Sequence, residues 1–164
     1  GEAADDGAIN RPIDAGGSAV IPKRKPKPKR PSLPSLITKA DTVTSQYIRQ
    51  KYADHAGNVT CISCPTVLPW KEAHCAHFIE RGKKATRWLE ENLHPACPSC
   101  NFYRKEIHMR EYTLAMIDLY GREALDHLRR AGALVLPASQ VRQLAEEAIE
   151  YATAKLKELK ASHD

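Results

Sequence analysis

The residues with the most distinctive chemistry lie between positions 61 and 101, where four of the five cysteines form two Cys-x-x-Cys pairs. The pairs are Cys61 with Cys64 and Cys97 with Cys100. Two intervening residues let both sulfurs of a tight turn reach one metal, and two such turns complete the tetrahedral four-thiolate arrangement that suits Zn2+. Because four thiolates leave no open coordination position, the sequence predicts a structural zinc site.

The cysteine usage also bears on the compartment. An odd number of cysteines, four of them in metal-type pairs, argues against an extracellular disulfide framework and for a reducing compartment. Cys75 belongs to neither pair, and we expect a small buried side chain there. No apolar run approaches the ~18 residues needed to cross a membrane, so we expect no membrane association.

A structural zinc site does not explain the histidines and amides that lie between and beside the cysteine pairs. They are His74, His77, Asn92, His94 and Asn101. Period-two alternation places His77 on the face of a strand opposite to His74, unless a bulge intervenes. Asn101 follows the last cysteine, in the first turn of an expected helix. The zinc site should therefore hold Asn101 opposite His77.

This layout resembles the HNH, or ββα-metal, nuclease motif, and the ending "CPSCN" resembles the zinc-containing endonuclease VII type. The segments "LITKADTVTSQYIRQ", "CISC", "HCAHF", "ATRWLEENLHPACPSCN" and "LYGREALDHL" together are similar to the lambdoid phage NinG (Rap) recombination family. Ala76 and Trp88 stand where that family usually has Gly and Phe, and neither change removes a functional group. The resemblance implies a phage-encoded nuclease acting on branched DNA, such as Holliday junctions and D-loops, in the bacterial cytoplasm.

The resemblance also implies roles for single residues. His77 is the expected general base, since a neutral imidazole can take a proton from the attacking water. Asn101 is the expected ligand of a catalytic Mg2+ or Mn2+ ion, with His74 as the second ligand and Glu72 as the alternative. His94 is expected to bind phosphate or support the metal shell, and Asn92 to hold His77 in orientation.

Basic residues supply candidate DNA contacts in a chain whose formal charge is +5. Arg87, Lys83 and Lys84 lie in the expected loop between strand and helix, where a guanidinium suits phosphate oxygens. A second group lies in the proline-rich stretch near the N-terminus: Lys23, Arg24, Lys25, Lys27, Lys29 and Arg30. The dipeptide Asp54-His55 looks like an HNH base but precedes the first cysteine pair, so we reject it.

The expected elements are those that must position these side chains. Apolar periodicity predicts helices over residues 35–54, 111–120 and 123–131, and a last helix starting at Pro137 with Ser139 as N-cap. Short strands are expected over 59–64, 73–79 and 92–96, with a helix opening at 97–101. The predicted fold is α+β, a zinc-stapled ββα-metal core embedded in helices. Its parts are a disordered basic arm (1–34), the nuclease domain (35–132) and a C-terminal helix for packing or dimerisation (133–164).

These inferences favour a DNA endonuclease in which water activated by His77 gives 5′-phosphate and 3′-hydroxyl ends. Resolving a two-fold junction needs two cuts, which favours a homodimer. One alternative keeps the HNH chemistry but applies it to nicking of ordinary duplex, as in phage packaging. The other is a zinc module that binds nucleic acid without cleaving it.

Overall fold

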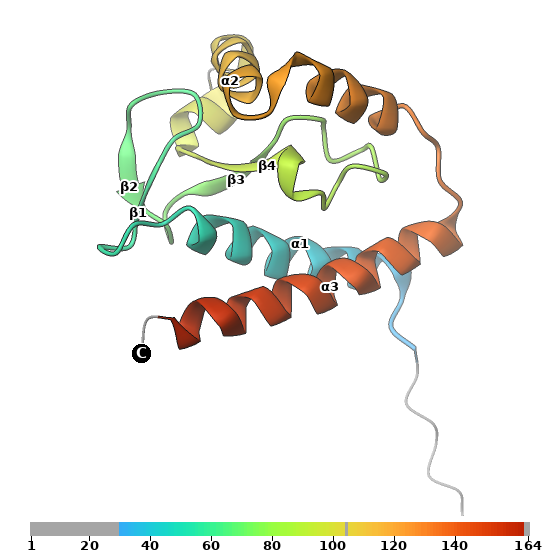
Figure 1. The fold of residues 1–164 in the computed structure, drawn as a ribbon. Coiled ribbons are helices and arrows are strands. Elements are labelled where there is room, and N and C mark those ends of the chain that lie inside the picture. The colour runs from blue at the N-terminus through green and yellow to red at the C-terminus, as the bar shows by residue number, and fades with distance from the viewer. Residues whose placement is uncertain (1–29, 104, 163–164) are drawn as a thin grey trace, which may run out of the picture. The chain divides into compact units, whose positions relative to one another are not determined.

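The computed structural model describes residues 30–103 and 105–162. The described residues form three long helices, four short strands and two short helical turns. In chain order these are α1 (Leu33–Lys51), β1 (Asn58–Thr60), β2 (Val67–Pro69), β3 (His74–His77), η1 (Glu90–Asn92), β4 (Leu93–Ala96), η2 (Ser99–Tyr103), α2 (Lys105–Gly132) and α3 (Ala138–Ala161) (Figure 1). The strands form two antiparallel pairs, β1 with β2 and β3 with β4. The predicted α+β class is therefore confirmed.

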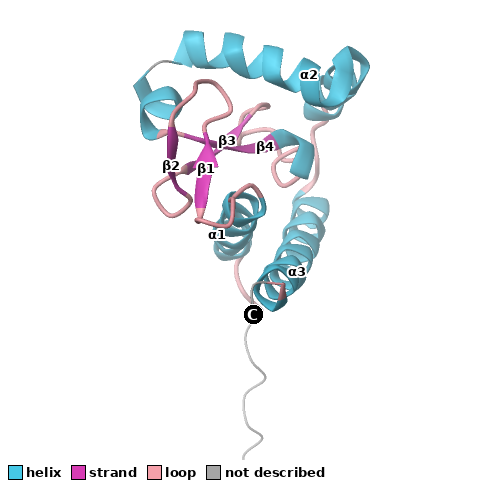
Figure 2. Cartoon of the chain, turned by 60° about the vertical axis from the view of Figure 1, so that its left-hand side comes forward, coloured by secondary structure: helices cyan, strands magenta, loops and turns pink. Residues whose placement is uncertain are grey.

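The β3–β4 hairpin lies at the centre of this arrangement. Its register pairs His74 with Ala96 and His77 with Leu93. Helix α2 covers one face of the hairpin, and α1 covers the other face with α3 packed beside it (Figures 1 and 2). Alternation along β3 sends Ala76 into the core below α2 and Cys75 into the core beside α1. Successive residues of one short strand thus serve two different cores.

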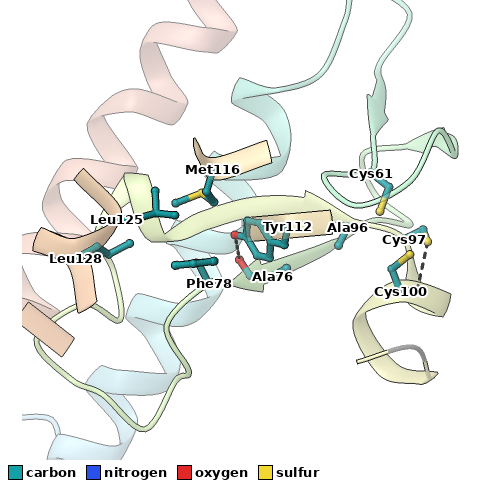
Figure 3. Packing of buried hydrophobic residues seen from close by; sticks show 10 residues of the cluster. All are labelled: Cys61, Ala76, Phe78, Ala96, Cys97, Cys100, Tyr112, Met116, Leu125 and Leu128. Carbon is teal, nitrogen blue, oxygen red and sulfur yellow. Dashed lines mark hydrogen bonds between the residues drawn. The ribbon is translucent and has the colours of Figure 1, made fainter. Parts of the chain in front are cut away.

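The core on the α2 side joins the cysteines to the long helix. Figure 3 shows it running from Cys61, Cys97 and Cys100 at one end to Leu125 and Leu128 of α2 at the other. Tyr112, which is fully buried, stands in the middle and donates a hydrogen bond of 3.4 Å to the carbonyl oxygen of Ala76. The end that carries the cysteines is therefore continuous with the apolar core of the domain.

The core on the other side is formed by α1 and α3, which run side by side (Figures 1 and 2). Ser32 caps α1 by accepting a hydrogen bond from the Ser35 backbone N–H at 3.3 Å. In α3 the residues buried at helical spacing are Val141, Ala145 and Ala152. Ala145 and Ala152 lie in apolar clusters with residues of α1, so this side of α3 packs within the chain. Packing is one of the two roles expected for this helix, and dimerisation stays a prediction.

Several element boundaries differ from the sequence expectation. The strand expected over 59–64 is only Asn58–Thr60 and pairs with β2, which was not expected. The helix expected to open at 97–101 is a five-residue π-helical turn, η2, over Ser99–Tyr103. Ser139 lies inside α3, whose N-cap is Pro137 without a side-chain cap, so the prediction of Ser139 as N-cap is wrong. Residues 33 and 34 of the expected arm belong to α1.

The two helices expected over 111–120 and 123–131 lie within α2, and they are separated by a kink at Gly121, where the backbone is not helical. Gly121 adopts φ 81° and ψ 161° within α2, a left-handed φ that favours glycine. Gly132 ends α2 where the helix comes close to the loop after β3. A Cβ atom on Gly132 would lie 2.8 Å from Cγ2 of Ile79, so this approach requires glycine.

Candidate functional site

The four paired cysteines converge, as the sequence predicted. The sulfur atoms of Cys61, Cys64, Cys97 and Cys100 all lie within 4.8 Å of one another, and those of Cys64 and Cys97 are 3.8 Å apart. A tetrahedral zinc ion with Zn–S bonds of about 2.3 Å places its sulfurs about 3.8 Å apart. The donor set therefore fits zinc in both type and spacing.

The local backbone explains why the sulfurs meet. The first pair lies in the turn of the β1–β2 hairpin, where the Cys61 N–H donates to the Thr66 carbonyl at 2.9 Å. In the second pair, Cys97 follows directly after β4 and Cys100 lies in η2. The Ile62 N–H donates to the Pro95 carbonyl of β4 at 2.9 Å, which ties the first turn to the strand that leads to the second. Two hairpins are thus joined at the four-cysteine cluster.

Burial changes the acidity of the thiols in this cluster. It raises the pKa of Cys61 and also raises the pKa of Cys100, so both thiols hold their protons more firmly than free cysteine. Zinc binds thiolates, so loading the cluster must release these protons. Zinc affinity should therefore fall as the pH falls.

A cavity of about 530 Å³ opens beside the cysteine cluster, on the α1 side of β3. It is lined by Ser45, Arg49, Ala73, His74, Cys75, His77, Arg81, Asn101 and Phe102. Three of the predicted site residues, His74, His77 and Asn101, therefore border the same space. Among the residues that the structure describes, no carboxylate lines this cavity.

His77, at the end of β3, is half-buried and borders this cavity. Burial, followed by the positive charge of Arg81, lowers its pKa from 6.5 to about 4. The imidazole is therefore neutral near pH 7 and can accept a proton. His77 also lines a second cavity of about 470 Å³, on the side of Lys83 and Arg129.

His74 and Asn101 contact each other directly, although they come from β3 and η2. The amide nitrogen of Asn101 lies 3.1 Å from Nδ1 of His74. His74 is the first residue of β3, and its ring also packs against Phe102 at 4.9 Å between centroids. With the amide nitrogen turned to the ring, the carbonyl oxygen of Asn101 is the end that can bind a cation. His74 thus reaches the cavity from the strand end, without a bulge.

Asn92 is fully buried and bonds across the loop that follows β3. Its amide oxygen accepts from the Ile79 N–H at 2.6 Å, and its amide nitrogen donates to the carbonyl oxygens of Ile79 and Thr86 at 3.0 and 2.9 Å. These bonds fix the chain two residues beyond His77. Asn92 contacts the backbone and not the cavity.

His94 does not join the other histidines, and this corrects the sequence expectation. It pairs with Ala76 in the hairpin, so its side chain lies on the α2 face and is fully buried. Its Nδ1 lies 3.0 Å from the Tyr112 hydroxyl, and its Nε2 lies 3.1 Å from the Tyr120 hydroxyl. Both ring nitrogens are therefore used inside the core. His94 cannot bind phosphate or support a metal shell in the cavity.

Arg87 is also placed differently from the expectation. Its guanidinium makes two hydrogen bonds to the carboxylate of Asp41, at 2.9 and 2.6 Å, and a third to the Arg81 carbonyl at 2.6 Å. Burial raises the pKa of Asp41, but the bonds and charge of Arg87 outweigh it and the pKa is lowered. This buried pair joins α1 to the loop, so Arg87 is a structural residue and does not face DNA.

The remaining candidates divide between the surface and the undescribed part of the chain. Lys83 is exposed, and Lys84 is half-buried next to the Asp41–Arg87 pair. Glu72 is exposed and does not line the cavity. Arg30 is exposed. The other basic residues of the expected arm lie outside the described residues: Lys23, Arg24, Lys25, Lys27 and Lys29.

Two residues that were set aside on sequence grounds have clear structural roles. Asp54 closes a turn by accepting from the backbone N–H groups of Ala56 and Asn58 at 2.9 and 2.8 Å. Cys75 is buried, as predicted, and burial raises the pKa of its thiol to about 12. Neither residue takes part in the four-cysteine cluster.

Sequence reasoning missed two arginines of the cavity, Arg49 and Arg81. Arg49 projects from α1 and donates to the carbonyl oxygens of Trp70, Lys71 and Ala73 at 3.2–3.4 Å. Arg81 is exposed and lies four residues after His77. The position of Arg81, in the loop after a strand histidine, could have indicated that it lies near His77. Nothing in the sequence indicated that Arg49 lies near this loop.

The described residues contain no helix that is both long and apolar enough to cross a lipid bilayer. The chain matches no curated protein and no solved structure at a significant level. Residues 20–162 match the model of one family, described as bacteriophage lambda NinG protein. This match spans most of the chain, including the cysteine cluster and the cavity. The chain therefore belongs to the bacteriophage lambda NinG family.

Proposed function

We propose that this protein is a metal-dependent DNA endonuclease of the ββα-metal (HNH) type, acting on branched DNA during phage recombination. The NinG family is associated with phage recombination. One observation supports the nuclease assignment above all others. A half-buried histidine and a His–Asn pair line one open cavity, next to a four-cysteine cluster that holds their elements together.

Each cavity residue has a distinct task in this proposal. Neutral His77 takes a proton from the water that attacks the phosphorus. His74 and the amide oxygen of Asn101 would hold a divalent cation. When bound, that cation stabilises negative charge on the scissile phosphate and on the departing 3′ oxygen. Asn92 positions His77 by fixing the loop just beyond it.

The donor set favours one kind of cation. Mg2+ prefers oxygen ligands, usually including carboxylates, whereas Mn2+ accepts imidazole more readily. Because the described cavity offers an imidazole and an amide but no carboxylate, we expect Mn2+ to support the reaction better than Mg2+.

Positive charge at the cavity suits a phosphate backbone. Arg49 and Arg81 both line it, and Lys83 stands on the other side of His77. Contacts of this kind release counterions from DNA, so binding should weaken steeply with salt. The basic stretch from Lys23 to Arg30 adds further charge for contacts that do not depend on base sequence.

The test compares a labelled four-way junction with a linear duplex of the same sequence. The zinc-loaded full-length chain is incubated with each DNA in Mn2+, in Mg2+ and with no added divalent ion. Cleavage of the junction that requires a divalent ion and leaves 5′-phosphate and 3′-hydroxyl ends is the expected result. His77→Ala should abolish cleavage while DNA binding persists. His55→Ala is the matched control because His55 is exposed and lies in the rejected Asp-His dipeptide.

Two other outcomes would change the assignment. Equal cleavage of junction and duplex would point to general duplex nicking. The described residues that line the cavity include no acid, which favours a second candidate, a zinc module that binds nucleic acid without cleaving it. Binding without cleavage in any divalent ion would support that module.

A further inference from the structure

A second cavity, of about 470 Å³, meets the first at His77. The described residues that line it are His77, Phe78, Ile79, Glu80, Lys83, Met109, Arg129, Gly132 and Ala133. Of these described residues, only His77 also lines the cavity of His74 and Asn101. The proposed general base therefore stands between two open spaces, and a DNA strand that crosses it has room on both sides.

Basic side chains outnumber acidic ones in the second cavity. Lys83 and Arg129 line it, and Glu80 is the one acid among its described lining residues. Lys83 and Arg129 are both exposed, so a ligand can reach them. They come from two separate elements, the loop after β3 and helix α2. A planar guanidinium with an ammonium group nearby is an arrangement that suits a phosphate.

Packing holds Arg129 at this cavity. Its guanidinium carbon lies 5.7 Å from the centre of the ring of Phe78, the residue that follows the general base. The preceding residue, Leu128, belongs to the same buried cluster as Phe78 (Figure 3). Three residues further on, a Cβ atom on Gly132 would lie 2.8 Å from Cγ2 of Ile79, so the end of α2 lies directly against the loop after β3. These contacts fix the position of Arg129 relative to β3.

The ion pair that Arg129 makes within the chain is a weak competitor for a phosphate. Nη1 of Arg129 lies 3.4 Å from a carboxylate oxygen of Asp126, one turn earlier in α2. The two side chains are 51% and 50% exposed, and a pair of this kind contributes little to stability. A phosphate can bind the same guanidinium through two parallel hydrogen bonds, which are stronger.

The geometry of the proposed reaction decides which phosphate lies at Arg129. The departing 3′ oxygen lies at the cation ligands His74 and Asn101, in the first cavity. In an in-line displacement the attacking water stands on the opposite side of the phosphorus, which is the side of His77. The strand that stays bonded to the phosphorus through its 5′ oxygen leads away from the departing group. It therefore runs past His77 into the second cavity.

We propose that Arg129 is a further DNA-binding residue, which binds the phosphate next to the scissile one on its 3′ side. The inference rests on the proposed nuclease function and deepens it, because it extends the path of the cleaved strand from the first cavity, across His77, to helix α2. Lys83 adds charge at the same phosphate. Loss of the Arg129 guanidinium should therefore remove one specific phosphate contact.

The experiment neutralises one phosphate of the DNA at a time. Four-way junctions with single methylphosphonate linkages at successive positions around the branch are titrated with the zinc-loaded full-length chain, with no added divalent ion. The wild type should lose affinity about three- to tenfold when the contacted phosphate is neutral. Arg129→Gln should bind the unmodified junction weaker by the same factor and lose nothing further at that one position. Cleavage of the unmodified junction in Mn2+ maps the scissile phosphate independently.

Three companion variants exclude a purely structural role. Arg130→Gln makes the same charge change in the next residue, which is exposed and is not among the described residues that line either cavity. It should keep the wild-type sensitivity to every methylphosphonate. Asp126→Asn removes the ion-pair partner and should not weaken junction binding, whereas Arg129→Lys should restore part of the lost sensitivity. Zinc content and circular dichroism confirm that each variant is folded.

The results distinguish failure of this inference from failure of the function on which it rests. If Arg129→Gln is as sensitive as the wild type at every position, the binding role of Arg129 is overturned even where His77-dependent cleavage is intact. A coupled phosphate on the 5′ side of the scissile one would overturn the assigned direction of the strand. A coupled phosphate in a wild-type chain that never cleaves would support Arg129 as a DNA contact and overturn the nuclease function alone. Failure to bind any junction would overturn both.

Discussion

The two faces of the β3–β4 hairpin each carry a histidine that burial keeps neutral, yet the two side chains have opposite surroundings. His77 borders an open cavity with His74 and Asn101. His94 is enclosed by Tyr112 and Tyr120, whose hydroxyls contact both ring nitrogens. The pKa of each imidazole is lowered from 6.5 to about 4, with burial as the largest cause. A shifted pKa therefore does not identify the functional histidine, whereas access to an open cavity does.

The difference follows from what packs on each face. Helix α2 brings two tyrosines onto the His94 face and seals it as part of the core. On the His77 face, α1 presents Ser45 and the turn η2 stands beside β3, which leaves room for water and phosphate. The four-cysteine cluster is common to both faces because it anchors η2 and the end of β4.

The largest effect is expected from removing the cysteine cluster, because both faces of the hairpin depend on it and should unfold together. A structural zinc site contributes ~10 kcal/mol or more to folding, a figure comparable to the whole stability of a small domain. Cys97→Ser should therefore unfold the chain or leave it without a cooperative thermal transition. Circular dichroism and zinc analysis test this. A chelator-treated wild type that retained its melting transition would contradict the structural role.

The next effect separates the two histidines by activity and stability. His77→Ala should reduce cleavage by about 10²–10⁴-fold, the usual contribution of a general base, with little loss of stability. His94→Ala should remove a fully buried ring together with its contacts to the hydroxyls of Tyr112 and Tyr120, and destabilise the chain by ~2–4 kcal/mol. Urea unfolding and cleavage rates are measured for both variants. A His94→Ala variant that is as stable as the wild type but inactive would contradict the assignment of His94 as a structural residue.

A pH titration tests whether both imidazoles are neutral in the folded chain. The folded pKa values of about 4 lie below the reference value of 6.5, so between these limits the unfolded chain binds more protons. These two groups should therefore make stability decrease as the pH falls from about 6.5 to about 4. For fully buried His94, lowering the pKa from 6.5 to about 4 corresponds to ~3 kcal/mol at most.

The readout is the free energy of unfolding between pH 4 and pH 7.5. His94→Phe removes one of the two groups, so its curve should be flatter than that of the wild type over this range. His127→Ala is the control because His127 is exposed. Equal slopes for wild type and His94→Phe would show that His94 is not protonated on unfolding.

The smallest effect distinguishes two arginines of the loop between β3 and η1. Arg81→Ala should weaken DNA binding a few-fold and reduce the slope of log affinity against log salt by about 1, the signature of one lost phosphate contact. Arg87→Ala should leave that slope unchanged but lower stability by ~2 kcal/mol, because Asp41 loses its buried partner. Salt-dependent binding and thermal melts measure the two effects. If Arg87→Ala reduced the salt slope and Arg81→Ala lowered the stability, Arg87 would be the DNA contact and Arg81 the structural residue.

Some parts of the site could be predicted because the signal is local. The Cys-x-x-Cys spacing fixes which sulfurs can share a metal, and period-two alternation along β3 sends Cys75 and Ala76 to opposite cores. The short strands and the turn η2 were harder to predict. Their lengths depend on hydrogen bonds to distant segments, such as that from Ile62 to Pro95. The same holds for Arg87, whose partner Asp41 lies in α1.

The sequence by itself determined the donor atoms: four thiols in two tight turns, a strand with two histidines, and an asparagine beside the last cysteine. These depend on residue type and on spacing along the chain, which are covalent properties. Only the tertiary structure decided that His77 lines a cavity, whereas His94 is enclosed by two tyrosines. It also decided that the guanidinium of Arg87 pairs with Asp41. Access and pairing depend on which helix covers which face, and that is settled by the packing of segments far apart in the chain.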